Sequence, residues 1–317
     1  MDLDNIANNL QAVGFNIQSY QLKLDKWANC KLVENKAGHK SGGYIVNTRL
    51  NLCSWKNHKT MESGSFPLDR QRVGSNYDYQ KAIQENQKQE RDKFFANAKK
   101  ASLKYNAIIE QPNAKSEYLQ RKQVSNFGCK VDGNGNLVIA LRSLDVKKDG
   151  TRTSYIRTLQ TIFPNGTKMM ESGCEKKGNM HLIGFNKIFK EPEKYTGKIL
   201  VAEGYATAAT LHMATGLPTV VAVDAGNLEP VMSKITKYYP NSEYTICADN
   251  DLKTERNIGR NVGVEAAKIC QEKYGCTVVI PDFTNIQNSE MLTDFNDLHC
   301  LMGIQEVKNQ ILKQHKD

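Results

Sequence analysis

The 317-residue chain lacks several features that would assign it to a familiar class. No apolar run approaches the roughly 20 residues that a membrane-crossing helix needs, and the amino terminus has neither the basic segment nor the apolar stretch of a signal peptide. We therefore expect a soluble, cytoplasmic protein without a membrane partner. None of its eight cysteines belongs to a Cys-x-x-Cys pair, which argues against a zinc ribbon and, in a cytoplasmic chain, indicates reduced thiols.

A phosphate-binding loop of the form Gly-x-x-x-x-Gly-Lys-Ser/Thr is also missing. The one Gly-Lys pair, Gly197-Lys198, is followed by Ile199 and has no glycine at the required upstream position. The chain therefore shows no sign of a nucleotide-driven motor of the P-loop class.

Charge is unevenly distributed along the sequence. Residues 1–196 carry 32 Lys and Arg against 19 Asp and Glu, whereas residues 197–299 carry 8 against 13. A basic half joined to an acidic half is typical of a protein that holds a polyanion on one part and metal ions on the other. Solvated surface lysines would give the same totals, so charge alone does not decide the function.

The pattern of residues predicts an α+β chain of four segments. Residues 1–76 form a small β-rich module, residues 77–115 a helical linker rich in helix formers, and residues 116–196 a second, basic β-rich segment. From residue 197 to residue 317, short apolar runs alternate with helical patterns, which predicts a compact parallel sheet with helices on both faces.

Strands are expected at residues 42–46 and 50–55 of the first module. Trp55 and the basic residues around it have the character of a surface that stacks on and pairs with single-stranded nucleic acid. The alternative is an ordinary small β core that uses Trp55 for packing.

Three acids stand at the ends of two apolar runs in the last segment. Glu203 follows the run 199–202, and Asp249 and Asp251 follow the run 244–248. Ligands of an open parallel sheet collect beyond the carboxyl ends of its strands, so these acids should converge there. Carboxylates that close repel one another unless a cation lies between them, and oxygen ligands favour Mg²⁺. The alternative is that each acid caps the helix after it.

These motifs resemble the TOPRIM domain, an α/β fold of primases, topoisomerases and some nucleases, in which a glutamate follows the first strand and Asp-x-Asp follows the third. The string 203–208, Glu-Gly-Tyr-Ala-Thr-Ala, resembles more narrowly the primases of conjugative plasmids and satellite phages. Residues 224–228, 259–267, 281–283 and 294–297 fit the same group.

The resemblance implies synthesis of short RNA primers from ribonucleoside triphosphates on a single-stranded DNA template. It implies that Glu203, Asp249 and Asp251 are catalytic and, with Asp297 and less strictly Asp294, hold Mg²⁺ or Mn²⁺. Basic residues of the preceding segment would then contact template or triphosphates; we expect Arg142, Arg157 and Lys168 to do so from their location, with surface charge as the alternative.

The chain departs from many such primases because it shows neither a Cys-rich zinc module nor a helicase segment. A replicative helicase would then act in trans, and any choice of template would fall to the Trp55 module. Two other functions remain open. One is a TOPRIM nuclease with the same acids and metal, and the other is a non-catalytic replication accessory protein that binds single-stranded DNA.

Overall fold

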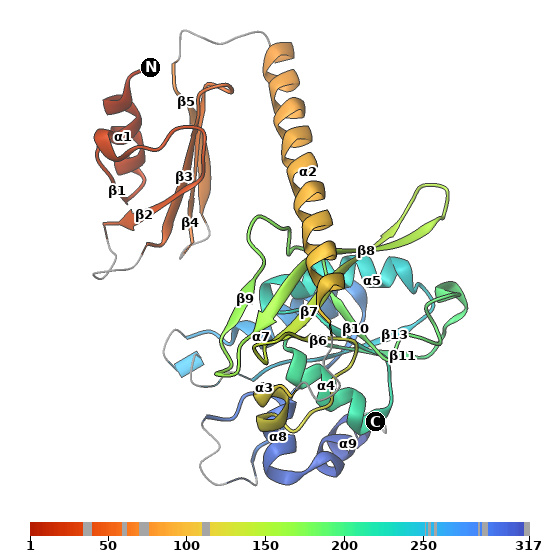
Figure 1. The fold of residues 1–317 in the computed structure, drawn as a ribbon. Helices are drawn as coiled ribbons and strands as arrows, with labels where there is room; N and C mark the ends of the chain where they lie inside the picture. Colours follow the sequence, from red (N-terminus) through yellow and green to blue (C-terminus); the bar gives the residue numbers. More distant parts are fainter. Residues whose placement is uncertain are drawn as a thin grey trace. The chain divides into compact units, whose positions relative to one another are not determined.

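The computed structural model divides into two compact units, Met1–Asp92 and Lys93–Asp317, each with its own core. The predicted fold class is confirmed, because β-rich parts and a long helix precede an α/β sheet (Figure 1). The structure describes residues 1–33, 40–58, 62–69, 76–109, 115–250, 252, 255–256, 259–284, 286 and 291–313.

The first unit is a five-stranded antiparallel sheet with one helix on one face, in the order β1-β2-β3-β4-β5. The predicted strands at 42–46 and 50–55 correspond to β3 and β4, but the helix was not predicted. Asp2 begins it by accepting the N–H groups of Asp4 and Asn5, both at 3.0 Å. The elements are α1 (Leu3–Ala12), the 3-10 helix η1 (Ser19–Gln21), β1 (Phe15–Asn16), β2 (Ala28–Leu32), β3 (Gly42–Asn47), β4 (Leu52–Asn57) and β5 (Ser63–Pro67).

The predicted linker helix is α2 (Asn76–Ala107), which spans the division between the units. Its last turns contribute Ala101 and Tyr105 to a small core with Val138, Ala140 and Leu159 of the second unit. The end of α2 is therefore a packed part of that unit rather than a solvated connection.

After the end of α2, the second unit continues with α3 (Glu117–Arg121) and a four-stranded antiparallel sheet in the order β6-β7-β8-β9. Turns at residues 132–135 and 164–166 connect its strands. The register of β7 and β8 shifts at Leu141/Arg142. The strands are β6 (Lys130–Val131), β7 (Leu137–Val146), β8 (Arg152–Ile162) and β9 (Lys168–Met170).

A second sheet of this unit has the order β10-β12-β11-β13-β14. Four neighbouring strands are parallel, as predicted, whereas β10 pairs antiparallel with β12 at one edge. The sheet thus extends across the predicted boundary at residue 197. Its strands are β10 (His181–Ile183), β11 (Lys198–Ala202), β12 (Thr219–Val221), β13 (Glu243–Cys247) and β14 (Thr277–Val279).

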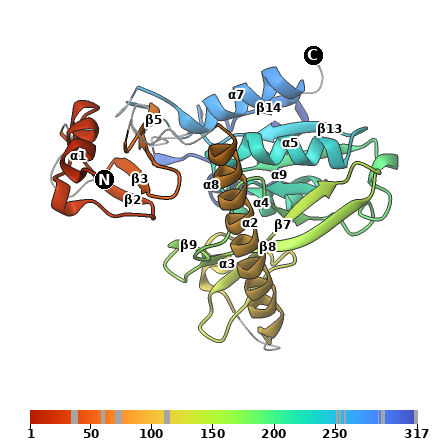
Figure 2. The same ribbon diagram turned by 90° about the horizontal axis from the view of Figure 1, so that it is seen from above.

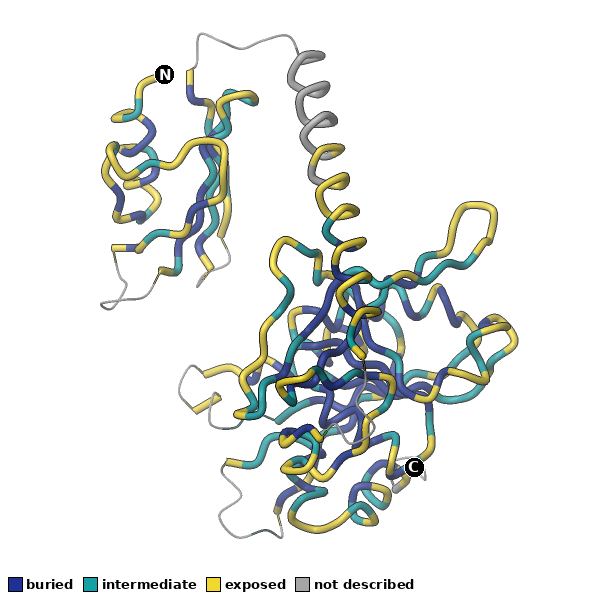
Figure 3. The backbone as a smooth tube through the Cα atoms, in the orientation of Figure 1, coloured by how far each residue is buried: buried dark blue, intermediate teal, exposed yellow. Residues whose placement is uncertain are grey.

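Helices cover both faces of this sheet, which places its strands in the most deeply buried part of the unit (Figures 1 and 3). Alternate residues of β11 point to opposite sides: Leu200 packs with α4, α8 and α9, and Val201 packs with α5 and α7. The short helix α8 was not predicted. The helices are α4 (Tyr205–Thr215), α5 (Leu228–Tyr238), α7 (Val262–Tyr274), α8 (Phe295–Met302) and α9 (Ile304–Lys313), with 3-10 turns η2 (Pro192–Lys194) and η3 (Ala225–Asn227).

Among the helices that the structure describes, none is both long and apolar enough to cross a membrane.

Candidate active site

The central pair of parallel strands brings two acids together. In the register of β11 and β13, Ala202 lies opposite Cys247, so both strands end at the same edge of the sheet. Glu203 directly follows β11, and Asp249 follows β13 after one more residue. Their mutual repulsion contributes to a raised pKa of Asp249, which means that the side chains lie within electrostatic reach of each other.

Helix α7 begins against these two acids. A Cβ atom on Gly263, in its first turn, would lie 2.7 Å from Oε1 of Glu203 and 2.7 Å from the carbonyl oxygen of Asp249. Only glycine permits this approach without a shift of the neighbouring atoms. The partial positive charge of the helix amino terminus is therefore close to both carboxylates.

Burial makes both carboxylates weak acids in the absence of a cation. Desolvation and, next, the charge of Asp224 raise the pKa of Glu203 to about 7. Desolvation, followed by the charges of Glu203 and Asp294, raises the pKa of Asp249 well above its usual range. Lys168 lowers the pKa of each acid. A positive charge between the acids would restore their ionised forms.

Asp294 rather than Asp297 lines the cavity with these acids. Asp294 caps α8: its Oδ1 accepts the N–H of Asp297 at 2.8 Å, and its Oδ2 accepts the hydroxyl of Thr207 at 3.1 Å. Asp297 turns toward Lys122, 3.4 Å away, and accepts the N–H of Thr293. Burial and the charge of Asp297 raise the pKa of Asp294.

The acids line a cavity of about 750 Å³ together with basic side chains, which we call its basic wall. Lys168, on β9, is the predicted basic residue that the structure brings to this cavity. Arg121 and Lys122 at the end of α3 also line it and were not predicted. A second cavity of about 380 Å³ lies beyond Glu203 and Asp249, next to Gly263. The basic side chains would attract a chain of phosphates to this cavity once a cation offsets the acids.

The structure places the other predicted residues away from this cavity. Arg142 lines a different cavity, of about 370 Å³, beside His181. Arg157 pairs with Asp145 at 3.7 Å and lies over the ring of Phe95. The register explains both positions. Arg157 shares a face of β8 with Leu159, which packs against α2, and the shift at Arg142 carries it toward β10.

The two remaining predicted residues are Trp55 and Asp251. Trp55 belongs to the first unit and packs edge-on against Phe15, with ring centroids 5.9 Å apart, in the core beneath α1. This packing favours the alternative that the sequence left open, in which Trp55 is part of an ordinary β core. Asp251 lies outside the described residues.

The part of the chain that holds these acids matches a known family. The match is to the Toprim domain and covers residues 198–305. These residues form a Toprim domain.

Two curated relatives resemble the chain over more than this domain. One DNA primase TraC of Escherichia coli is 28% identical over 254 residues, which is 80% of this chain and 16% of that protein. A second DNA primase TraC of Escherichia coli is 31% identical over 133 residues, 42% of this chain and 12% of that protein. The chain thus spans less than a fifth of the length of these relatives.

Two solved primase structures resemble the chain only distantly. The DnaG catalytic core has a TM-score of 0.41 and 14% identity, covering 69% of this chain and 79% of that one. The Aquifex aeolicus primase with zinc-binding and RNA polymerase domains has a TM-score of 0.39 and 16% identity, covering 98% and 84%.

Two features near the Toprim acids were missed at the sequence level. Asp224 follows β12, the other neighbour of β11, and lines both cavities. The strand-end rule that found Glu203 applies equally to Asp224, which pairs with Lys176 at 2.5 Å.

Val223, just before Asp224, has a φ of 82°, a strained conformation for a β-branched residue. Its N–H donates to the backbone carbonyl of Glu203 at 2.7 Å, so the strained residue contacts the backbone of a site residue.

The Toprim acids fit a hard divalent cation. Among the described residues, no three His, Cys, Asp or Glu side chains form a complete metal-binding group. Even so, Oε1 of Glu203 and Oδ1 of Asp249 are buried and have no hydrogen-bond partner in that part of the chain. A buried oxygen without a partner is costly, and a cation bound to it removes the cost.

The raised pKa of Glu203 predicts a dependence of stability on pH. Its pKa rises from 4.5 to about 7 on folding, so the metal-free protein should lose stability as pH rises between these values. One pKa unit corresponds to about 1.4 kcal/mol, and we expect a loss on the order of 2 kcal/mol. Thermal unfolding with a chelator, at about pH 5 and about pH 7.5, should show a smaller decrease for Glu203→Gln than for wild type. Equal decreases would contradict the assignment.

Proposed function

We propose that this chain is a DNA primase, which joins ribonucleotides into short RNA primers on a single-stranded DNA template. The observation that carries the proposal is that Glu203 and Asp249 line a cavity with a basic wall, and each has a buried carboxylate oxygen without a hydrogen-bond partner among the described residues. The similarity to DNA primase TraC over 80% of the chain supports this activity among those of Toprim proteins.

In this proposal Glu203 and Asp249 hold Mg²⁺ or Mn²⁺, and Asp251 and Asp294 are further candidate ligands. When bound, the cation neutralises the triphosphate and stabilises the charge that develops as a 3′-hydroxyl attacks the α-phosphate and pyrophosphate leaves. Asp297 instead orients Lys122 through their ion pair. We prefer Asp294 to Asp297 as a direct ligand, because Asp294 lines the cavity with Glu203 and Asp249.

The basic wall supplies the groups that bind the triphosphate. Lys168 lies near both acids, since its charge lowers the pKa of each. Arg121 and Lys122 approach from α3 on the same wall. Fixed positive charges of this kind orient phosphates for in-line displacement at no cost in reorganisation. The partners in this proposal are single-stranded DNA, ribonucleoside triphosphates and a helicase acting in trans.

The proposal is tested by incubating the full chain with single-stranded DNA, labelled ribonucleotides and either Mg²⁺ or Mn²⁺. We expect short RNA products that require both the template and the metal, and a DNA strand that stays intact. Degradation of the DNA without RNA synthesis would identify a nuclease instead. Robust DNA binding without either reaction would favour the non-catalytic accessory protein.

A further inference from the structure

The first unit has an exposed tryptophan on the sheet face opposite α1. Trp27 precedes β2, and its side chain is 47% exposed. The indole lies on the backbone of Gly43 in the central strand, since a Cβ on Gly43 would be 2.7 Å from Cε2 of Trp27. Its Nε1 donates to Oδ1 of Asn29 at 3.0 Å. The ring is therefore held against the sheet beside Gly43, while about half of the residue stays exposed to solvent.

The strand register defines which residues share this face. Asn29 lies opposite Gly43, Gly43 opposite Lys56, and Lys56 opposite Ser63, so their side chains point to one side of the sheet. The neighbouring row, which contains Tyr44 and Trp55, points to the α1 side and forms the core. We call the first side the Trp27 face.

The Trp27 face is basic and polar. Lys31 lies two residues beyond Asn29 on the same side of β2, and Lys56 lies next to Gly43 on β4. Neither lysine has a carboxylate partner among the described residues. No strand residue of this face is acidic, and its other members include Ser54 and Ser65 as well as the apolar, partly buried Ile45 and Leu52. The positive charge beside the exposed ring is thus available to a polyanion.

We propose that the Trp27 face binds single-stranded DNA, with a base stacked on Trp27 and phosphates paired with Lys31 and Lys56. An exposed aromatic ring between lysines fits a single strand, because its bases are free to stack, whereas a duplex hides them. The choice of DNA over RNA rests on the proposed function. The face would hold template outside the Toprim domain, in the module where Trp55 was expected to serve.

The two tryptophans allow a direct test in the full chain, which contains only Trp27 and Trp55. In Trp55→Phe, emission comes from Trp27, and we expect oligo-dT to quench it on stacking. In Trp27→Phe, emission comes from Trp55, which is partly buried against the core on the α1 side, and we expect little quenching. Unchanged emission of Trp27 while fluorescence anisotropy shows that the oligonucleotide is bound would overturn the inference.

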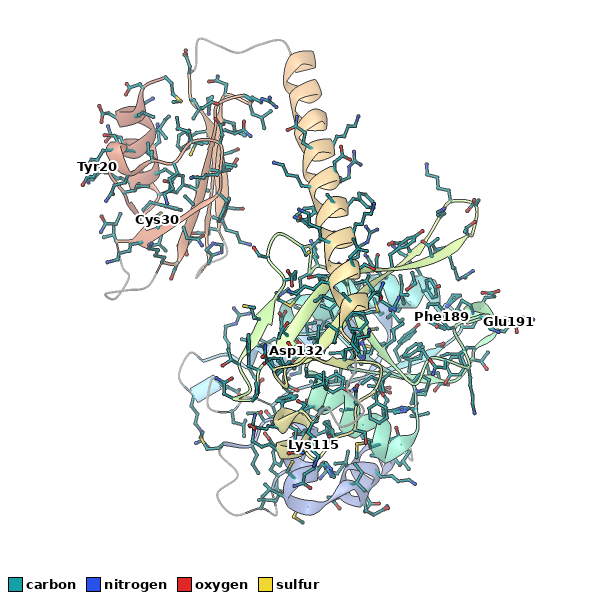
Figure 4. The ribbon with its side chains drawn as sticks, viewed as in Figure 1. Tyr20, Cys30, Lys115, Asp132, Phe189 and Glu191 are labelled. Carbon is teal, nitrogen blue, oxygen red and sulfur yellow. The ribbon has the colours of Figure 1, made fainter. Side chains whose placement is uncertain are left out.

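Affinity gives the second readout. Trp27→Ala should weaken oligo-dT binding about tenfold, within the range for loss of one stacked base. Gly43→Ala should weaken it in the same direction by displacing the indole, since its backbone suits alanine. Tyr20→Ala is the matched control: Tyr20 is 82% exposed but lies on η1, at the outer edge of the unit in Figure 4. Wild-type affinity in Trp27→Ala would overturn the inference.

Further arms separate this inference from the proposed function. Equal quenching of Trp27 by duplex DNA, or stronger binding of an RNA strand, would contradict single-stranded DNA as the ligand. Asp249→Asn should keep the quenching of Trp27 while losing primer synthesis. Primer synthesis that persists without any quenching would reject the Trp27 face and leave the primase assignment standing.

Discussion

Asp249→Asn is expected to lower primer synthesis by at least about 10³-fold. The substitution keeps the size of the side chain and removes the charge that would hold the cation. Cation stabilisation of a transferring phosphoryl group contributes several kcal/mol, and each 1.4 kcal/mol is about a factor of ten in rate. Glu203→Gln should have a similar effect, because Oε1 of Glu203, like Oδ1 of Asp249, is buried without a hydrogen-bond partner among the described residues.

The measurement is the initial rate of RNA synthesis on single-stranded DNA, with thermal unfolding to show that the variants fold. Glu243→Gln is a matched control because Glu243 begins the same strand, β13, at its far end and is exposed. We expect it to retain wild-type activity. A rate for Asp249→Asn within tenfold of wild type would remove Asp249 from the catalytic site.

Gly263→Ala is expected to lower primer synthesis by about 100-fold and to destabilise the second unit by about 1–3 kcal/mol. The new methyl group would lie 2.7 Å from Oε1 of Glu203 and from the carbonyl oxygen of Asp249. Because one of these atoms belongs to the backbone, α7 or the end of β13 must shift. Displacing catalytic groups by about 1 Å costs on the order of 10²-fold in rate.

Gly133→Ala is the control for this substitution. Gly133 lies in the turn before β7, has no neighbour within 4 Å of a built Cβ and does not need a positive φ. Its activity and melting temperature should stay close to wild type. If Gly263→Ala behaves like Gly133→Ala, the close packing of α7 on the acids has no functional role.

The sequence predicted the Toprim sheet well because strand and helix periods differ and short connections force parallel strands together. That rule alone brought Glu203 and Asp249 to one edge. The same rule covers Asp224, which follows the neighbouring strand β12. Asp224 was not predicted as a site residue because the motif contains only the glutamate and the Asp-x-Asp pair.

Side-chain direction in the β-rich parts was not predictable in the same way. Alternation shows that Trp55 shares a face with Cys53, but only the unpredicted helix α1 decides that this face is the core. The exposure of Trp27, on the other face, was therefore not predictable from the sequence. Arg142 and Arg157 lie away from the acids for a related reason, since the register shift at Arg142 and the packing of α2 fix which residues face the acids.

The most direct test of the central claim is calorimetric titration of the metal-free full chain with Mn²⁺. We predict that wild type and Glu243→Gln bind Mn²⁺. The affinity should be at least about tenfold lower in both Glu203→Gln and Asp249→Asn, since even the mutation of a residue that hydrogen-bonds a metal ligand lowers metal affinity by that factor. Mn²⁺ affinity that is unchanged in both variants would contradict the claim that these two carboxylates hold the catalytic cation.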